Sequence, residues 1–341
     1  MKQKYWLLLA LLLIALSACS RNVEVIISPH IELTKALNAL SWGRFYETDD
    51  QIAYIAHEPN RSRSIRTLTK GDSFSRSDFS LSEDRDAVGG LCFINESALY
   101  YIKRANDQRP LCHVDVTTGE SKIVYEGDII YAIDYKDSIF LLTSDGALIQ
   151  FLPAEDKQRI LILGNIYTFF CYNGHIYYNM ESESKRGLYD LFSLDLSDGS
   201  IEALPLEQSV ERFLIYEDVI YGTAQYGLHG GSGVGIFSFN LESGEFKTIL
   251  PPDHSVLNVV GNLLQFYDRE IIFAGSENYR KATYALNIDT GERRILFYNN
   301  YMSMYVVNGK LYGFDLFDNY ICYDLLKNRE VKADFENLRL Q

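Results

Sequence analysis

Two runs of sequence decide the fold: Ile176-Tyr177-Tyr178-Asn179 and, a little further along, Leu194-Asp195-Leu196-Ser197-Asp198-Gly199. Short apolar runs bounded by Gly, Asp and Asn are typical of β-strands joined by tight turns. Glycine at the end of the second run suits the left-handed backbone position that a short hairpin requires. The two runs therefore predict the second, third and fourth strands of an antiparallel meander.

The first run recurs along the whole chain. Seven Ile- and Tyr-rich runs follow one another at steps of 37 to 51 residues, counted from Ile52, Leu99, Ile139, Ile176, Ile220, Ile271 and Leu311. A mean step of about 43 residues is the length of one propeller blade.

The second run recurs as an apolar residue, Asp or Asn, another apolar residue and a Gly turn. Copies lie at residues 114–120, 194–199, 239–245 and 286–292, and a weaker copy at 323–328 has Asn328 in the place of Gly. We interpret the repeated polar residue as a local partner of the hairpin backbone and not as a metal ligand, because one copy per blade is far from the next. These residues are Asp115, Asp195, Asn240, Asn287 and Asp324.

One such sheet cannot bury both of its faces, so the copies must stack face to face in a ring. We therefore expect an all-β fold, a seven-bladed β-propeller of four-stranded antiparallel blades, in a single domain over residues 43–341. Six or eight blades fit the repeats less well. The pattern resembles bacterial β-propeller lipoproteins of the TolB-like and low-density-lipoprotein-receptor-like types, whose second strand carries a similar Ile-Tyr-Tyr motif. That resemblance implies the architecture and no particular activity.

The N-terminus has the features of an export signal. Lys2 and Lys4 precede an uncharged apolar stretch at residues 5–16, which is shorter than the ~20 residues that span a bilayer. Leu16-Ser17-Ala18-Cys19 resembles the lipobox of bacterial lipoproteins. We expect residues 1–18 to be a signal peptide and Cys19 to be lipidated, which would anchor the chain on the extracytoplasmic side of the cell membrane, or in the outer membrane of a Gram-negative cell. An ordinary signal peptide cleaved near Ala18 is the alternative.

Residues 19–42 are expected to form a lipidated tether. Residues 23–27 have the pattern of a strand, which could add to a sheet edge where the ring closes. Apolar residues at Ile31, Leu33, Leu37 and Leu40 predict a short helix over residues 31–40.

Charge and motifs exclude several classes of function. The mature chain would carry 30 basic and 46 acidic side chains, which argues against nucleic acid as a partner. No metal, nucleotide or nucleophile motif is present, so we expect no metal and no cofactor. Cys92, Cys112, Cys171 and Cys322 include no C-x-x-C pair and are expected to be buried free thiols.

Two features suggest chemistry but have a simpler interpretation. The Gly-rich segment 227–235, which contains His229, could cradle an anion or resemble an esterase oxyanion loop. It lacks the partner motifs that either role needs, so a surface loop is favoured. The 25 Tyr and 19 Phe residues could stack on carbohydrate, but most lie in the strand runs and are expected to pack between sheets.

The connections between second and third strands indicate which face could bind a partner. In a propeller they share one face with the links between blades, here called the loop face; the other two kinds of hairpin share the opposite face, the hairpin face. The long connections at residues 58–63, 103–110, 180–187, 224–235 and 275–281 hold nine basic and five acidic residues. The candidate ligand-face residues are Arg61, Arg63, Arg104, Arg109, Lys185, Arg186, His229, Arg280 and Lys281.

These features favour a monomeric binding or scaffold module over an enzyme. Its partners would be the membrane, through the lipid, and an acidic protein or polysaccharide of the cell envelope. The alternatives are a glycan hydrolase or lyase with carboxylates at the central channel, and an accessory subunit of an export or uptake system. Neighbouring carboxylates with raised pKa at the channel mouth would favour the enzyme, and Arg with aromatic side chains would favour binding.

Overall fold

The computed structural model describes residues 31–41, 43–57, 63–69, 75–79, 88–94, 98–103, 108–115, 118, 120–182, 187–225, 234–251, 258–277, 280–298, 303–314 and 320–332. Cys19 and the strand expected at 23–27 lie outside this part of the chain, so no contact of either can be stated.

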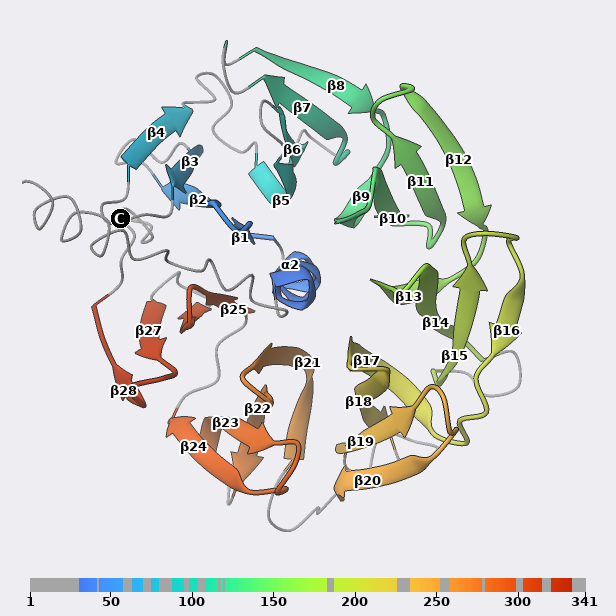
Figure 1. The fold of residues 1–341 in the computed structure, drawn as a ribbon, viewed down its shortest axis with the longest axis vertical. Coiled ribbons are helices and arrows are strands. Elements are labelled where there is room, and N and C mark those ends of the chain that lie inside the picture. The colour runs from blue at the N-terminus through green and yellow to red at the C-terminus, as the bar shows by residue number, and fades with distance from the viewer. Residues whose placement is uncertain are drawn as a thin grey trace, which may run out of the picture.

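The described strands form seven four-stranded antiparallel sheets arranged in a ring (Figure 1). Blade 1 contains β1 (Phe45–Glu47), β2 (Gln51–His57), β3 (Arg63–Thr69) and β4 (Ser75–Phe79); blade 2 contains β5 (Val88–Ile94), β6 (Ala98–Lys103), β7 (Leu111–Asp115) and β8 (Ser121–Tyr125). Blade 3 contains β9 (Ile129–Tyr135), β10 (Ser138–Thr143), β11 (Leu148–Leu152) and β12 (Lys157–Ile162); blade 4 contains β13 (Ile166–Tyr172), β14 (His175–Glu181), β15 (Tyr189–Asp195) and β16 (Ile201–Ala203).

The remaining three blades follow the same order. Blade 5 contains β17 (Ser209–Tyr216), β18 (Val219–Gln225), β19 (Val234–Asn240) and β20 (Phe246–Leu250); blade 6 contains β21 (Asn258–Tyr267), β22 (Glu270–Glu277), β23 (Arg280–Asn287) and β24 (Arg293–Phe297). Blade 7 contains β25 (Ser303–Val307), β26 (Lys310–Phe314), β27 (Tyr320–Asp324) and β28 (Arg329–Glu330). The seven-bladed propeller predicted from the repeats is confirmed.

The hairpin between the third and fourth strands has the predicted chemistry. Gly199, Gly244 and Gly291 have φ of 78°, 70° and 72°, and Asn328 takes the same place with φ of 52°. The repeated Asp or Asn accepts backbone hydrogen bonds within its own turn, as in Asp195 Oδ1 from the Ser197 amide at 2.7 Å. Oδ1 accepts from the amide three residues ahead at Asp115, Asn240, Asn287 and Asp324, which confirms their local role.

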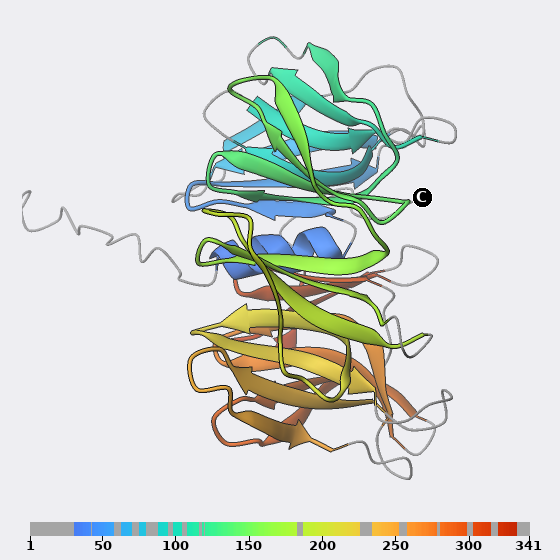
Figure 2. The ribbon, with the colours of Figure 1, turned by 90° about the vertical axis from the view of Figure 1, so that its right-hand side faces the viewer.

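Helix α2 (Ile31–Leu40) fills the centre of the ring, with its axis along the channel (Figures 1 and 2). It contacts the innermost strand of every blade. Leu33, Ala36, Leu37 and Ala39 of the helix are buried. The helix expected at these residues is therefore present, but it forms part of the core of the ring.

Side-chain amides fix α2 to the last two blades. Asn38 Nδ2 donates to the carbonyl of Val306 at 3.1 Å, and its Oδ1 accepts from the amide of the same residue at 3.2 Å. Gln265 Nε2 donates to Leu37 O at 3.3 Å, to Ser41 Oγ at 3.0 Å and to the Met304 carbonyl at 2.8 Å. The helix is thus bonded to the inner strands of blades 6 and 7.

Blades 1 and 7 meet without exchanging a strand, since each is built from four consecutive strands. Aromatic side chains fill the junction: the Phe45 ring lies 5.3 Å from the Tyr305 ring and 5.2 Å from the Tyr312 ring, between centroids. The Asn308 amide donates to Glu47 Oε2 at 3.1 Å. Packing between sheets closes the ring where these blades meet.

Within the described residues, no helix combines the length and apolar character that crossing a membrane would demand.

Candidate functional site

The two faces of the ring differ in their connections. First and second strands are joined by two or three residues, whereas second and third strands are separated by up to eight. The short turns at 173–174, 217–218, 268–269 and 308–309 have positive φ at both residues, as the tightest hairpins require. Most connections between second and third strands, on the loop face, are therefore longer than the turns between first and second strands, but the two residues between β22 and β23 are an exception.

Several candidate basic residues lie in strands and not in loops, which corrects the sequence-based expectation. Arg63 begins β3, and Arg280 and Lys281 begin β23, opposite Glu277 and Ser276. Only residues 278 and 279 separate β22 from β23. Arg280 and Lys281 are exposed, and exposed charge does not prevent backbone pairing, so their polarity falsely suggested a loop.

The other candidates divide into two groups. Arg61, Arg104, Lys185, Arg186 and His229 lie outside the described residues. Arg109 is described, and its Nε donates to Asp128 Oδ1 at 2.6 Å while Nη2 donates to Oδ2 at 3.2 Å. This pair holds the pKa of Asp128 below its usual value and joins blade 2 to blade 3, so the charge of Arg109 is largely compensated.

An aromatic and cationic cluster that sequence reasoning did not single out lies at the loop-face end of blades 4 and 5. The rings of Tyr167 and Tyr189 stack with centroids 4.7 Å apart and an interplanar angle of 24°. The guanidinium carbon of Arg212 lies 4.7 Å from the Tyr167 ring centroid. All three side chains are half-buried. We call this set the Tyr-Tyr-Arg cluster.

Two β-bulges bring the cluster together. The register of β13 shifts between Ile166 and Thr168, and that of β17 shifts between Val210 and Arg212. The extra residue of a bulge interrupts the alternation of side chains between the two faces of a sheet. Tyr167 and the residues beside Glu211 therefore depart from that alternation. Because both bulges lie near the start of an innermost strand, the cluster is at the loop face.

Asn179 locks both bulges from β14 and is fully buried. Its Oδ1 accepts from the Thr168 amide at 2.8 Å, and its Nδ2 donates to the carbonyls of Val210 at 2.6 Å and Glu211 at 3.1 Å. One side chain therefore fixes the backbone on both sides of the cluster. Such support from buried hydrogen bonds is what keeps a binding site preorganised.

The electrostatics of the cluster are mixed. Arg212 Nε is buried and makes no hydrogen bond within the described structure, and Nη2 lies 3.5 Å from the Tyr167 hydroxyl. Burial raises the pKa of Tyr189, and Glu181 and Glu211 add to this. The cluster thus combines flat aromatic surface, an unused guanidinium donor and two nearby carboxylates.

Several described carboxyl groups have a pKa below the ordinary value: Asp128, Asp145, Asp195, Asp198, Glu217, Asp289 and Asp324. In this part of the chain no three His, Cys, Asp or Glu side chains group as metal ligands would. Cys112 and Cys171 are buried free thiols, as predicted, and Cys322 is also buried.

Comparison with known proteins informs the fold alone. No family model matches the sequence, and no curated protein matches it. Among solved structures, a prolyl endopeptidase is similar with a TM-score of 0.64 and 11% identity, over 92% of this chain and 53% of that one. An oligogalacturonate lyase in complex with manganese has a TM-score of 0.59 and 9% identity, over 84% of this chain and 88% of that one.

TolB from Acinetobacter baumannii is also similar, with a TM-score of 0.47 and 12% identity, over 72% of this chain and 63% of that one. The chain thus spans about half of the endopeptidase and less than two thirds of TolB. At these identities the likeness concerns the fold alone. The fold defines the chain as a seven-bladed β-propeller of consecutive four-stranded blades, with a helix in its channel.

Proposed function

We propose that this chain is a monomeric binding module of the bacterial cell envelope, anchored by a lipid on Cys19, which presents its loop face to an acidic polysaccharide. The observation that carries the proposal is the Tyr-Tyr-Arg cluster, held in place by Asn179. Arg with aromatic side chains on the loop face is the combination that favours binding over catalysis.

The chemistry of the cluster fits a sugar that carries a carboxylate. Aromatic rings offer a flat apolar surface on which a sugar ring can lie, and their hydroxyls remain at the wet edge. The guanidinium of the half-buried Arg212 can donate to a carboxylate of the ligand, a charge-assisted hydrogen bond. The carboxylates of Glu181 and Glu211 can accept from sugar hydroxyls. The exposed Arg280 and Lys281 on the same face would add long-range attraction.

The direction of helix α2 agrees with an N-terminal anchor. The innermost strand of each blade runs from the loop face to the hairpin face, and only residues 41–44 connect α2 to the start of β1. Helix α2 therefore ends at the loop face and begins, at Ile31, at the hairpin face. A lipid on Cys19 would draw the hairpin face toward the membrane and leave the Tyr-Tyr-Arg cluster facing away from it.

A binding experiment with matched ligands tests the proposal. The chain from Ser20 to Gln341 retains every described element and can be titrated with polygalacturonate and with its methyl-esterified, uncharged counterpart. We expect binding of the charged polymer that weakens with salt, and a loss of at least tenfold in Tyr167→Ala and in Arg212→Gln. Arg159→Gln is the control, because Arg159 is exposed in β12, on blade 3.

Unchanged binding in both cluster variants would show that the cluster is not the site. Cleavage of the polymer during incubation would instead support the alternative of a glycan lyase or hydrolase. The anchor is tested separately: incorporation of labelled palmitate and recovery in the membrane fraction should both be lost in Cys19→Ala.

A further inference from the structure

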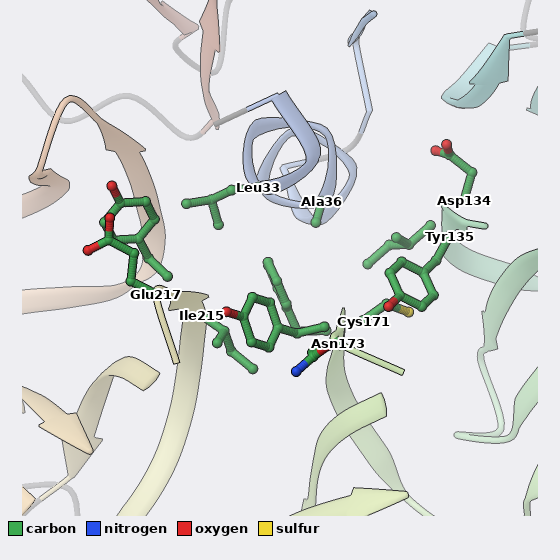
Figure 3. A pocket seen from close by; sticks show the side chains of 12 residues that line it. Leu33, Ala36, Asp134, Tyr135, Cys171, Asn173, Ile215 and Glu217 are labelled. Carbon is green, nitrogen blue, oxygen red and sulfur yellow. The ribbon is translucent and has the colours of Figure 1, made fainter. Parts of the chain in front are cut away.

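A cavity of about 290 Å³ opens at the hairpin face between helix α2 and blades 3, 4 and 5. Figure 3 shows Leu33 and Ala36 reaching it from the helix, with Tyr135, Cys171 and Ile215 on the blade side.

The cavity wall is built from the same position in three successive blades. Tyr135, Tyr172 and Tyr216 each end the innermost strand of their blade. The Tyr135 hydroxyl accepts from the Gly174 amide at 2.7 Å, and the Tyr172 hydroxyl accepts from the Asp218 amide at 3.1 Å. Because each hydroxyl is bonded to the turn of the next blade, these two rings are held as fixed walls.

The charged groups of the wall already have partners in the protein. Asp134 accepts from the Tyr46 hydroxyl at 2.6 Å and lies 3.8 Å from Lys35 Nζ. Glu217 accepts from Arg269 at 3.1 Å. Burial raises the pKa of the Cys171 thiol well above its ordinary value, so this group is neutral and unreactive. A ligand would therefore gain its binding energy from apolar surface and not from charge.

From this geometry we infer that the cavity binds an acyl chain. Leu33, Ala36, Ile133, Phe170 and Ile215 supply the apolar surface that such a chain would bury. The volume holds roughly ten non-hydrogen atoms, if each takes about the 30 Å³ of a water molecule, which matches a chain of about ten carbons. The exposed Asn173 at the turn marks the polar rim where a carboxyl or ester head would remain in water.

Two sources could supply the acyl chain: a fatty acid or lipid from the membrane, or the lipid expected on Cys19. Leu33 of the wall lies two residues after Ile31, where the described helix begins on this same face. Cys19 precedes Ile31 by twelve residues, which reach at most about 40 Å when extended. The inference does not depend on a ligand at the loop face, because the two sites lie at opposite ends of the ring.

A chain-length series tests the inference on the unmodified pocket. The chain from Ser20 to Gln341, which carries no lipid, is titrated by calorimetry with hexanoate, octanoate, decanoate and dodecanoate below their micelle concentrations. We expect affinity to rise about fourfold for each added methylene and to level off near ten carbons, where the cavity is full. Absence of binding, or affinity independent of chain length, overturns the inference.

Two substitutions in the helix wall separate this pocket from other apolar surface. Ala36→Phe fills the cavity and should weaken decanoate binding at least tenfold. Leu33→Ala enlarges the cavity, so affinity should level off at a longer chain than in the parent. Tyr167→Ala, on the loop face, is the control that should leave decanoate binding unchanged. If neither helix variant alters the series, the fatty acids bind elsewhere and the inference is wrong.

The lipidated full-length protein, placed in nanodiscs, distinguishes the two sources. If it binds decanoate as the lipid-free chain does, the pocket serves an external acyl chain. If only the lipid-free chain binds decanoate, the protein's own lipid occupies the pocket. Loss of polygalacturonate binding in Tyr167→Ala concerns the loop face alone, so the two proposals fail independently.

Discussion

Asn38 in helix α2 and Val306 in β25 are joined by two hydrogen bonds. Asn38 Nδ2 donates to the Val306 carbonyl at 3.1 Å, and Asn38 Oδ1 accepts from the Val306 amide at 3.2 Å. Asn38 is fully buried, so water cannot replace either bond. The side chain therefore substitutes for a neighbouring strand at this point of the channel.

Replacing Asn38 by Leu should destabilise the protein by about 2–4 kcal/mol, because a buried donor and a buried acceptor on Val306 would each lose their partner. Urea unfolding followed by tryptophan fluorescence or circular dichroism measures the loss. Gln158→Ala, at an exposed position of β12, is the control and should stay within about 0.5 kcal/mol of the parent. An equally small change in Asn38→Leu would contradict the anchoring role of this residue.

Asn179 should matter for ligand binding although it need not touch the ligand. Asn179→Leu removes the three bonds that hold the bulges of β13 and β17, so the Tyr-Tyr-Arg cluster should lose its arrangement. We expect weaker polygalacturonate binding together with a lower unfolding temperature. Tyr167→Phe keeps the ring stack and should lower neither quantity by a comparable amount. Full binding in Asn179→Leu would mean that the bulges do not depend on this amide.

The hydroxyls of Tyr135 and Tyr172 should protect single amides in the next blade. Tyr135→Phe leaves the Gly174 amide without its partner, and Tyr172→Phe does the same at Asp218. Each change should cost about 1 kcal/mol and accelerate hydrogen exchange at that amide while the other keeps its rate. Equal exchange in the parent and both variants would rule out these bonds between blades.

Acid should weaken the contact between blades 2 and 3. Arg109 holds the pKa of Asp128 below its ordinary value of 3.8, so the pair stabilises the fold above that pH, and this contribution is lost as the pH falls through the lower folded-state pKa. Arg109→Gln should therefore reduce stability at pH 7. The difference in stability between pH 7 and pH 3 should then be smaller in this variant than in the parent. The urea midpoint at both pH values measures this. Arg159→Gln is the matched control, since Arg159 donates to Gln150 and not to a carboxylate.

The blades could be predicted from sequence because their determinants are local. Alternation within a strand and a left-handed Gly or Asn in a turn act over a few residues, so the hairpins at Gly199 and Asn328 were identifiable without knowledge of the ring. The strand ends were less certain. Arg280 and Lys281 are exposed at the start of β23, and exposed charge has the same pattern in a loop as at the end of a strand.

The position of α2 and the Tyr-Tyr-Arg cluster could not be predicted in the same way. The pattern of Leu33 and Leu37 predicts a helix, but the diameter of the ring decides what the helix packs against. The cluster depends on one bulge within blade 4, one bulge within blade 5 and the packing of these two blades, which no local pattern encodes. One signal was available: Asn179 stands in the second-strand run of blade 4 where blades 1, 2 and 3 have Ile55, Ile102 and Leu142.

The channel helix also sets the order in which the molecule can be completed. Asn38 and Val306 are 268 residues apart in sequence, so the helix that leaves the ribosome early finds this partner only when nearly all of the chain has been made. Closing so long a loop is slow, and the side of the helix that packs against blade 7 remains exposed until that blade has formed. Assembly of blade 7 is therefore the event that converts a row of sheets into a sealed ring, and a chain truncated before β25 should remain open and prone to aggregate.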